Sequence, residues 1–71
     1  MSGHVYRVTE VVGSSSDGVD AAVRTAVARA AETLHGLDWF EVNEIRGRIE
    51  NGRIAEYQVG VKVGFRLDEN A

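Results

Sequence analysis

The sequence predicts a single α+β domain over residues 1–71, in which one helix packs against a three-stranded antiparallel sheet in the order strand, helix, strand, strand. Three observations predict this fold. The chain opens on a short alternating segment, continues into a stretch with apolar residues three and four apart, and ends in a long alternating half that contains Asn51-Gly52. Because proline is absent and the only low-complexity run is three serines, no linker divides the chain.

The first half predicts a strand followed by a helix. Alternation of apolar and polar residues places the strand at His4 to Val12, and the glycine- and serine-rich segment Gly13 to Gly18 is expected to be a loop. The helix should begin near Val19 and end before Gly36, which is expected to be its left-handed C-cap. Its apolar stripe comprises Val19, Val23, Ala26, Val27, Ala30 and Leu34.

The second half predicts a long hairpin. Asn51-Gly52 readily takes positive φ at both positions, which favours a two-residue type I′ turn. The last strand alternates without a break from Ala55 to Leu67, so we expect it to be central, with Phe40 and Val42 joining its apolar face beneath the helix. The turn sets a register that pairs Ile49 with Ile54, Ile45 with Gln58, Glu41 with Lys62 and Trp39 with Gly64.

The size of the chain predicts both its shape and a need for partners. Strands of about 13 to 15 residues extend on the order of 45 Å, whereas a compact 71-residue chain has a radius of gyration of about 11 Å. The sheet must therefore curl around the helix or project beyond it. A chain this short buries only about 60% of its unfolded surface, and it contains no cysteine for a disulfide. His4 and His35 are too isolated for a zinc site, which leaves self-association.

Charge and motifs exclude several functions. The net charge is −3 and the eight basic residues are scattered, which argues against a nucleic-acid partner. No apolar run approaches the roughly 18 residues of a membrane span, and the N-terminus lacks the apolar core of a signal peptide, so we expect no membrane partner and a cytoplasmic location. We expect no enzyme either, because the sequence shows no nucleophile–base arrangement, phosphate-binding glycine motif or metal-ligand spacing.

The sheet face away from the helix carries the candidate ligand residues. Trp39 faces Gly64, which leaves one face of the indole open to a flat aromatic ligand, and Arg66 on the same face suits a phosphate. Gln58 offers a donor and an acceptor to the amide edge of a heterocycle, but it lies roughly 20 Å from Trp39 along a straight strand. A ligand that needs both would require a neighbouring chain or strong curvature. Trp39 and the isoleucines on this face, Ile45, Ile49 and Ile54, equally suit an interface between copies.

Three segments of the sequence resemble the dodecins, small flavin-binding proteins of bacteria and archaea. These segments are RAAETL at residues 29–34, DWFEVNEIRGRI at residues 38–49 and EYQVGVKVGFRL at residues 56–67. The resemblance covers nearly the whole chain from VYRVTEVVG onward, with its elements in order and at family spacing. It implies a three-stranded antiparallel sheet wrapped around one helix and assembly into a hollow homododecamer, which would supply the partner that chain length requires.

The resemblance also implies roles for individual residues. A tryptophan at the position of Trp39 stacks on the flavin ring, with two-fold-related copies sandwiching a pair of flavins, and a glutamine at the position of Gln58 binds the pyrimidine edge. Arginines matching Arg46 and Arg66 are candidates to contact the tail or phosphate of FMN. In the simple register Arg46 falls on the helix side, so this role requires a bulge near Gly47.

Cofactor identity and function follow from the same resemblance. Bacterial relatives tend to hold FMN and archaeal relatives riboflavin, and some bacterial relatives bind coenzyme A through basic residues, for which Arg7 and Arg29 are the candidates. The expected function is non-catalytic storage and buffering of FMN, with Trp39 quenching the excited flavin. The alternative is an oligomeric structural or interaction protein without flavin, in which Trp39 only fills an interface. Substitution of Trp39 by alanine separates the two hypotheses.

Overall fold

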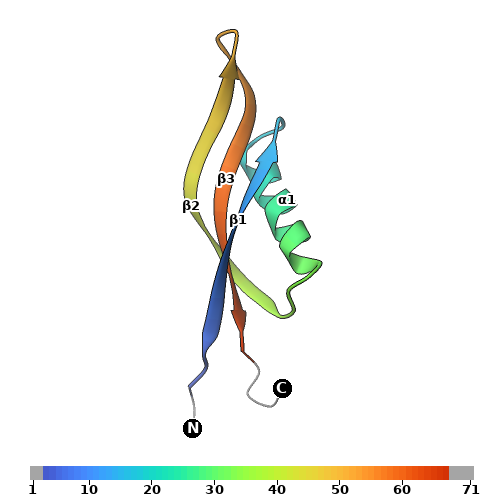
Figure 1. Cartoon of the computed structure of the whole chain (residues 1–71), viewed down its shortest axis with the longest axis vertical. Coiled ribbons are helices and arrows are strands. Elements are labelled where there is room, and N and C mark those ends of the chain that lie inside the picture. The colour runs from blue at the N-terminus through green and yellow to red at the C-terminus, as the bar shows by residue number, and fades with distance from the viewer. Residues whose placement is uncertain (1–2, 68–71) are drawn as a thin grey trace.

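The computed structural model describes residues 3–67 and contains one helix on one face of a three-stranded sheet. Its elements are β1 (Tyr6–Ser15), α1 (Val19–Ala31), β2 (Leu37–Glu50) and β3 (Arg53–Arg66). The strand order is β1-β3-β2 and both pairs are antiparallel. The predicted element order and the central position of the last strand are therefore confirmed (Figure 1).

The first strand is longer at its end than the sequence predicts. Gly13 was expected to open a loop, but β1 continues to Ser15, which pairs with Tyr57 of β3. Gly13 is buried beneath the helix, and a Cβ at this position would overlap the Ala22 carbonyl oxygen and lie 2.8 Å from the Ala26 Cβ. The missing side chain therefore lets α1 approach the backbone of β1 closely, which is a different use of glycine from the flexibility of a loop.

The helix buries alanines rather than large side chains. Ala22, Ala26 and Ala30 form the core with Val59, Val61 and Val63 of β3. Partly buried side chains surround this core: Val11, Val19, Val23, Val27, Leu34 and Leu37. The helix ends at Ala31, although the Leu34 N–H still donates to the Ala30 carbonyl. Gly36 has the positive φ of 75° expected of a cap but lies in the connection that follows, so the predicted C-cap is displaced from the helix end.

The hairpin register is as predicted at its two ends and differs between them. Asn51 and Gly52 have φ of 54° and 76°, as a type I′ turn requires. Trp39 faces Gly64, and Glu41 faces Lys62, as expected. The middle of β2 is shifted by one residue, so that Ile45 faces Val59, and Gln58 is paired with Arg46 instead. Two irregularities cause the shift, one between residues 42 and 44 and one between residues 48 and 49, and their effects cancel at the ends.

The helix covers less of the sheet than the sequence predicts. Phe40 and Val42 were expected beneath α1, but Phe40 is 55% exposed and Val42 is also exposed. The reason is that α1 lies along β1 and β3, so β2 passes outside the covered area (Figure 1). A groove of about 460 Å³ runs between Phe40 and the helix residues Val23 and Val27.

The sheet projects beyond the helix, which is one of the two shapes that strand length predicts. The molecule measures 56 × 20 × 13 Å and has a radius of gyration of 14.9 Å, well above the value for a compact chain of this length. The β2–β3 hairpin projects past one end of the helix, and the start of β1 and the end of β3 extend past the other (Figure 1). Ile49 and Ile54, near the tip of the hairpin, are 75% and 59% exposed, so the chain alone leaves these apolar side chains in water.

Candidate ligand-binding site

The candidate site lies on the open face, by which we mean the sheet face opposite α1. Side chains alternate along β3, and Val59, Val61 and Val63 lie beneath the helix. The intervening residues therefore belong to the open face, together with their partners on β1 and β2. On β3 these residues are Glu56, Gln58, Gly60, Lys62, Gly64 and Arg66.

Trp39 lies directly over Gly64 of the central strand. A Cβ on Gly64 would overlap the six-membered ring of the indole and lie 2.7 Å from its Cδ2 atom. Gly64 is buried by this contact, whereas Trp39 remains 39% exposed. The backbone of β3 thus supports the indole from below and leaves ring surface available, which is what stacking of a flat ligand requires.

A second aromatic residue and an arginine lie next to the indole. The ring centroids of Tyr6 and Trp39 are 6.4 Å apart with an interplanar angle of 50°. Tyr6 is also paired with Arg66, whose side chain is exposed, with Nη1 3.5 Å from Nε2 of His4. Tyr6 was not predicted from the sequence. Alternation alone could have placed it on one face of its strand, but its approach to Trp39 depends on the β1–β3 register, which no turn signal sets.

Arg46 and Gln58 are brought together on the open face. The Arg46 Nε donates to Gln58 Oε1 at 3.1 Å, and its Nη1 donates to Glu44 Oε1 at 2.6 Å. The simple register placed Arg46 on the helix side, and the structure corrects this. The irregularity between Arg48 and Ile49 shifts the pairing and turns Arg46 to the side of Gln58, as the bulge expected near Gly47 would do.

The four predicted flavin residues form two separate groups within one chain. Trp39 and Arg66 lie near Gly64, while Arg46 and Gln58 lie six residues away along β3. Six extended residues span roughly 20 Å, which exceeds the size of one flat ring system. The chain therefore does not assemble the complete predicted site by itself.

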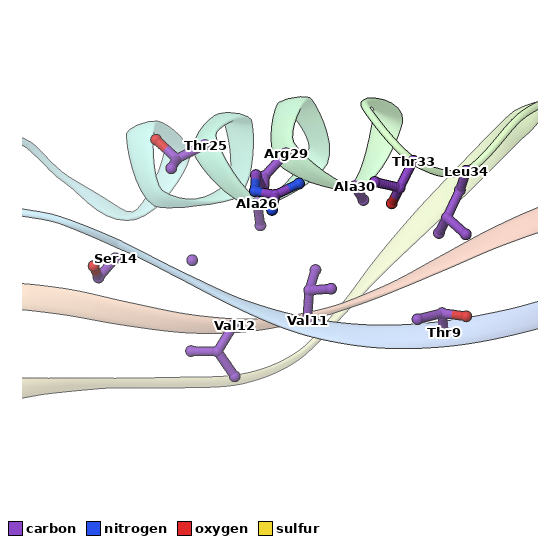
Figure 2. A pocket seen from close by; sticks show the side chains of 11 residues that line it. Thr9, Val11, Val12, Ser14, Thr25, Ala26, Arg29, Ala30, Thr33 and Leu34 are labelled. Atoms are coloured by element: carbon purple, nitrogen blue, oxygen red, sulfur yellow. The ribbon is translucent and has the colours of Figure 1, made fainter.

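The two arginines predicted for coenzyme A lie elsewhere. Arg7 is paired with Phe65, on the β1 face that points toward the helix side. Arg29 lies on α1, where its Nη1 is 3.3 Å from Glu32 Oε1, and it lines a groove of about 590 Å³ between α1 and β1 (Figure 2). Four hydroxyl-bearing residues also line this groove, namely Thr9, Ser14, Thr25 and Thr33, and Arg7 does not.

Metal-ligand clusters and membrane-spanning helices are both absent from the part of the chain that the structure describes. Within residues 3–67, no three His, Cys, Asp or Glu side chains gather as metal ligands would. The one helix in this range is too short and too polar to cross a membrane.

The fold and the open face together define a class of small α+β proteins that expose an aromatic platform on one side of a sheet. By aromatic platform we mean the Trp39 ring resting on the backbone at Gly64. The family model for dodecin matches residues 5–68. A curated dodecin of Thermus thermophilus is 55% identical over 67 residues, which cover 94% of this chain and 97% of that protein. The chain therefore belongs to the dodecin family, whose members are small homo-oligomeric proteins that bind flavins.

Solved structures support the same assignment. A dodecin from Streptomyces coelicolor has a TM-score of 0.89 and 67% identity, covering 97% of this chain and 99% of that chain. A dodecin from Streptomyces davaonensis has a TM-score of 0.88 and 60% identity, covering 96% of this chain and 100% of that chain. The β-α-β-β fold of this chain is thus the dodecin fold.

Proposed function

We propose that this protein stores and buffers FMN in the cytoplasm as a homododecameric shell, without catalysing a reaction. The observation that carries the proposal is the indole of Trp39, which rests on the β3 backbone at Gly64 and keeps 39% of its surface exposed. An electron-rich indole stacked on a flavin ring binds it and can quench its excited state by electron transfer. Two-fold-related copies of Trp39 would enclose a pair of flavins.

The polar residues are proposed to bind the parts of FMN that Trp39 does not contact. Gln58 matches the donor and acceptor groups of the pyrimidine edge, and Arg46 and Arg66 match the negative charge of the FMN phosphate. Support comes from the residue types substituted in solved variants of the Thermus thermophilus dodecin, two of which replace an arginine by alanine and one of which replaces a tryptophan by phenylalanine. FMN is favoured over riboflavin here because two arginines are available for the phosphate.

The incomplete site of a single chain supports the part of the proposal that concerns assembly. Trp39 and Gln58 lie roughly 20 Å apart along β3, so a flavin that contacts both must lie between copies. The apolar side chains needed for such contacts are present and uncovered, including Phe40, Ile49 and Ile54. Ile49 and Ile54 are cross-strand partners, and an exposed apolar cluster of this kind on a small chain marks an interface.

Coenzyme A is a second candidate ligand. The groove between α1 and β1 is lined by Arg29 and by the threonines Thr9, Thr25 and Thr33, and a guanidinium with hydroxyl groups is a combination suited to phosphate and ribose (Figure 2). Arg7 would have to contact such a ligand from outside this groove. Direct titration of the purified protein with coenzyme A tests this candidate separately from flavin.

The proposal is tested by adding FMN to the flavin-free protein and following flavin fluorescence. We expect strong quenching that saturates near one flavin per chain and co-elutes with a particle of about twelve chains on a sizing column. Trp39→Ala should abolish most of the quenching and weaken binding by about 5- to 150-fold, because base-type stacking contributes roughly 1 to 3 kcal/mol, while the particle size should stay unchanged.

The alternative function makes the opposite prediction for the same variant. If Trp39 only fills an interface, Trp39→Ala will dissociate the particle, and the intact protein will leave FMN fluorescence undiminished. Trp39→Phe is the matched variant, because it keeps an aromatic ring over Gly64 and should preserve assembly in either case.

A further inference from the structure

The amide of Gln58 is held between a cation and a carboxylate on the open face. Gln58 Oε1 accepts from Arg46 Nε at 3.1 Å, and Gln58 Nε2 donates to Glu56 Oε2 at 3.0 Å. A guanidinium can only donate hydrogen bonds and a carboxylate can only accept them. Of the two orientations of the amide, only the observed one satisfies both neighbours.

Both neighbours are themselves anchored. Arg46 Nη1 is bound to Glu44 Oε1 at 2.6 Å, and Glu56 Oε2 lies 3.8 Å from Arg48 Nε. The Glu56 side chain is only 29% exposed, which makes it better shielded from water than the other charged members of this group. The partly buried, charge-assisted hydrogen bond that Glu56 accepts from Gln58 is therefore stronger than a contact between fully exposed charges on the surface.

We propose that Glu56 is a positioning residue for flavin selection, acting through Gln58. This inference rests on the proposed flavin site. A primary amide has two acceptor lone pairs and two N–H donors, and Arg46 and Glu56 use one of each. One acceptor and one donor remain. They match a ring edge that carries an N–H beside a carbonyl, which is the N3–H and carbonyl pattern of the flavin pyrimidine ring.

Loss of Glu56 loosens this arrangement without removing a ligand contact. Gln58 would keep its bond to Arg46, but its N–H groups would lose the carboxylate that fixes them. The expected effect is a roughly 3- to 10-fold weaker affinity for a flavin with a free N3–H, as follows from one hydrogen bond of about 1 kcal/mol. In a flavin methylated at N3, the methyl group removes the N–H donor and occupies the space of the Gln58 amide, which prevents the paired contact, so loss of Glu56 should not change its affinity.

The test compares riboflavin with 3-methylriboflavin, both uncharged, so that the charge change at residue 56 does not act on a phosphate. Dissociation constants are measured by fluorescence quenching for the assembled wild-type protein, Glu56→Ala and Glu56→Gln, with particle size checked in each case. We expect Glu56→Ala to weaken riboflavin alone. Glu56→Gln should recover part of the affinity, because its side-chain carbonyl still accepts from Gln58 and the change is nearly isosteric.

A charge-matched control and a double variant sharpen the result. Glu50 contacts Arg48, as Glu56 does, but has no hydrogen bond to Gln58, so Glu50→Ala should leave both affinities unchanged. In a Gln58→Ala background, Glu56→Ala should cause no further loss, because the two residues act as one unit.

Different outcomes separate this inference from the function on which it rests. If the wild-type protein binds neither flavin, the proposed function itself fails. If it binds riboflavin but Glu56→Ala changes nothing, or weakens both flavins equally, Glu56 does not position Gln58. Equal wild-type affinity for riboflavin and 3-methylriboflavin would show that the pyrimidine edge is not read at Gln58.

Discussion

At the scale of single residues, the contact between Trp39 and Gly64 connects sequence to binding. The indole can lie on the sheet only because the residue opposite has no side chain, since a Cβ on Gly64 would overlap the ring. Gly64 is thus as much a part of the platform as Trp39. Its role is steric and not conformational, because Gly64 does not have a positive φ that would favour glycine.

Gly64→Ala tests this role. The added methyl group would occupy the space of the indole and push it off β3, so we expect FMN affinity to fall by about 5- to 150-fold, comparable to removal of a stacking contact of roughly 1 to 3 kcal/mol. The measurement is FMN quenching combined with the emission maximum of Trp39, the only tryptophan. The backbone conformation accepts alanine, so the fold should persist.

Gly60→Ala is the matched control for that experiment. Gly60 lies on the same strand and face, but an added Cβ would be in ordinary contact with Glu44 Cβ at 3.4 Å and would meet the ends of two flexible side chains, with Asn43 Oδ1 at 3.0 Å and Glu10 Oε2 at 3.5 Å. These side chains can move aside, so FMN binding should be retained. Wild-type affinity in Gly64→Ala would show that the position of the indole over β3 does not matter for binding.

Some residues of the candidate site could be predicted from the sequence and others could not. Trp39 and Gln58 could be selected because their side-chain chemistry is distinctive in any register. Tyr6 could not, because its importance comes from the Trp39 ring on another strand. Alternation places Glu56 beside Gln58 on one face of β3, but the hydrogen bond between their side chains depends on side-chain conformations that the sequence does not give. An exposed glutamate in an alternating strand is otherwise indistinguishable from an ordinary solvated charge.

At the scale of secondary-structure elements, the close approach of α1 to β1 depends on Gly13. The helix presents alanines, and its Ala22 carbonyl and Ala26 Cβ lie where a Gly13 side chain would be. Because the obstacle includes backbone, the helix would have to move as a unit. We expect Gly13→Ala to destabilise the protein by about 1 to 3 kcal/mol, the range of overpacked cores.

Thermal or denaturant unfolding measures this effect, with Gly3→Ala as the control. A Cβ on Gly3 meets nothing within 4 Å, so that variant carries the same change of residue type without the contact. Unfolding midpoints should be compared at equal protein concentration, since assembly contributes to stability. Equal midpoints for the two variants would mean that the α1–β1 packing is looser than the structure shows.

The hairpin shows which parts of a sheet can be predicted. The Asn51-Gly52 turn and the unbroken alternation of β3 were sufficient to place both ends of the register correctly. The two irregularities between Trp39 and the turn could not be predicted, because they cancel: Trp39 pairs with Gly64 whether both are present or neither is. The simple register predicted the wrong side of the sheet for Arg46 for this reason alone. The bulge expected near Gly47 corresponds to the irregularity between Arg48 and Ile49.

At the scale of the whole molecule, the exposed apolar ends of the elongated chain and the incomplete site both require further copies of the chain. A 56 Å chain whose hairpin projects past its helix leaves Ile49 and Ile54 in water, and it holds the aromatic platform roughly 20 Å from the amide of Gln58. Packing against further copies would bury the isoleucines and bring the two ends of the site to one ligand. Chain length pointed to such partners, but the sequence could not show that the helix leaves β2 uncovered.

Ile49→Lys tests this dependence of binding on assembly. Ile49 is 75% exposed in the single chain, so a lysine there costs the isolated fold little, whereas it would place an unpaired charge in an apolar interface. We expect smaller particles by light scattering and an FMN affinity, measured by quenching, that is at least tenfold weaker, which corresponds to about 1.4 kcal/mol or more. Ser16→Lys, which adds the same charge at an exposed loop position, should keep the wild-type particle size and FMN affinity. A monomeric variant that still bound FMN with wild-type affinity would mean that one chain's platform is sufficient, and the argument that the site lies between copies would be lost.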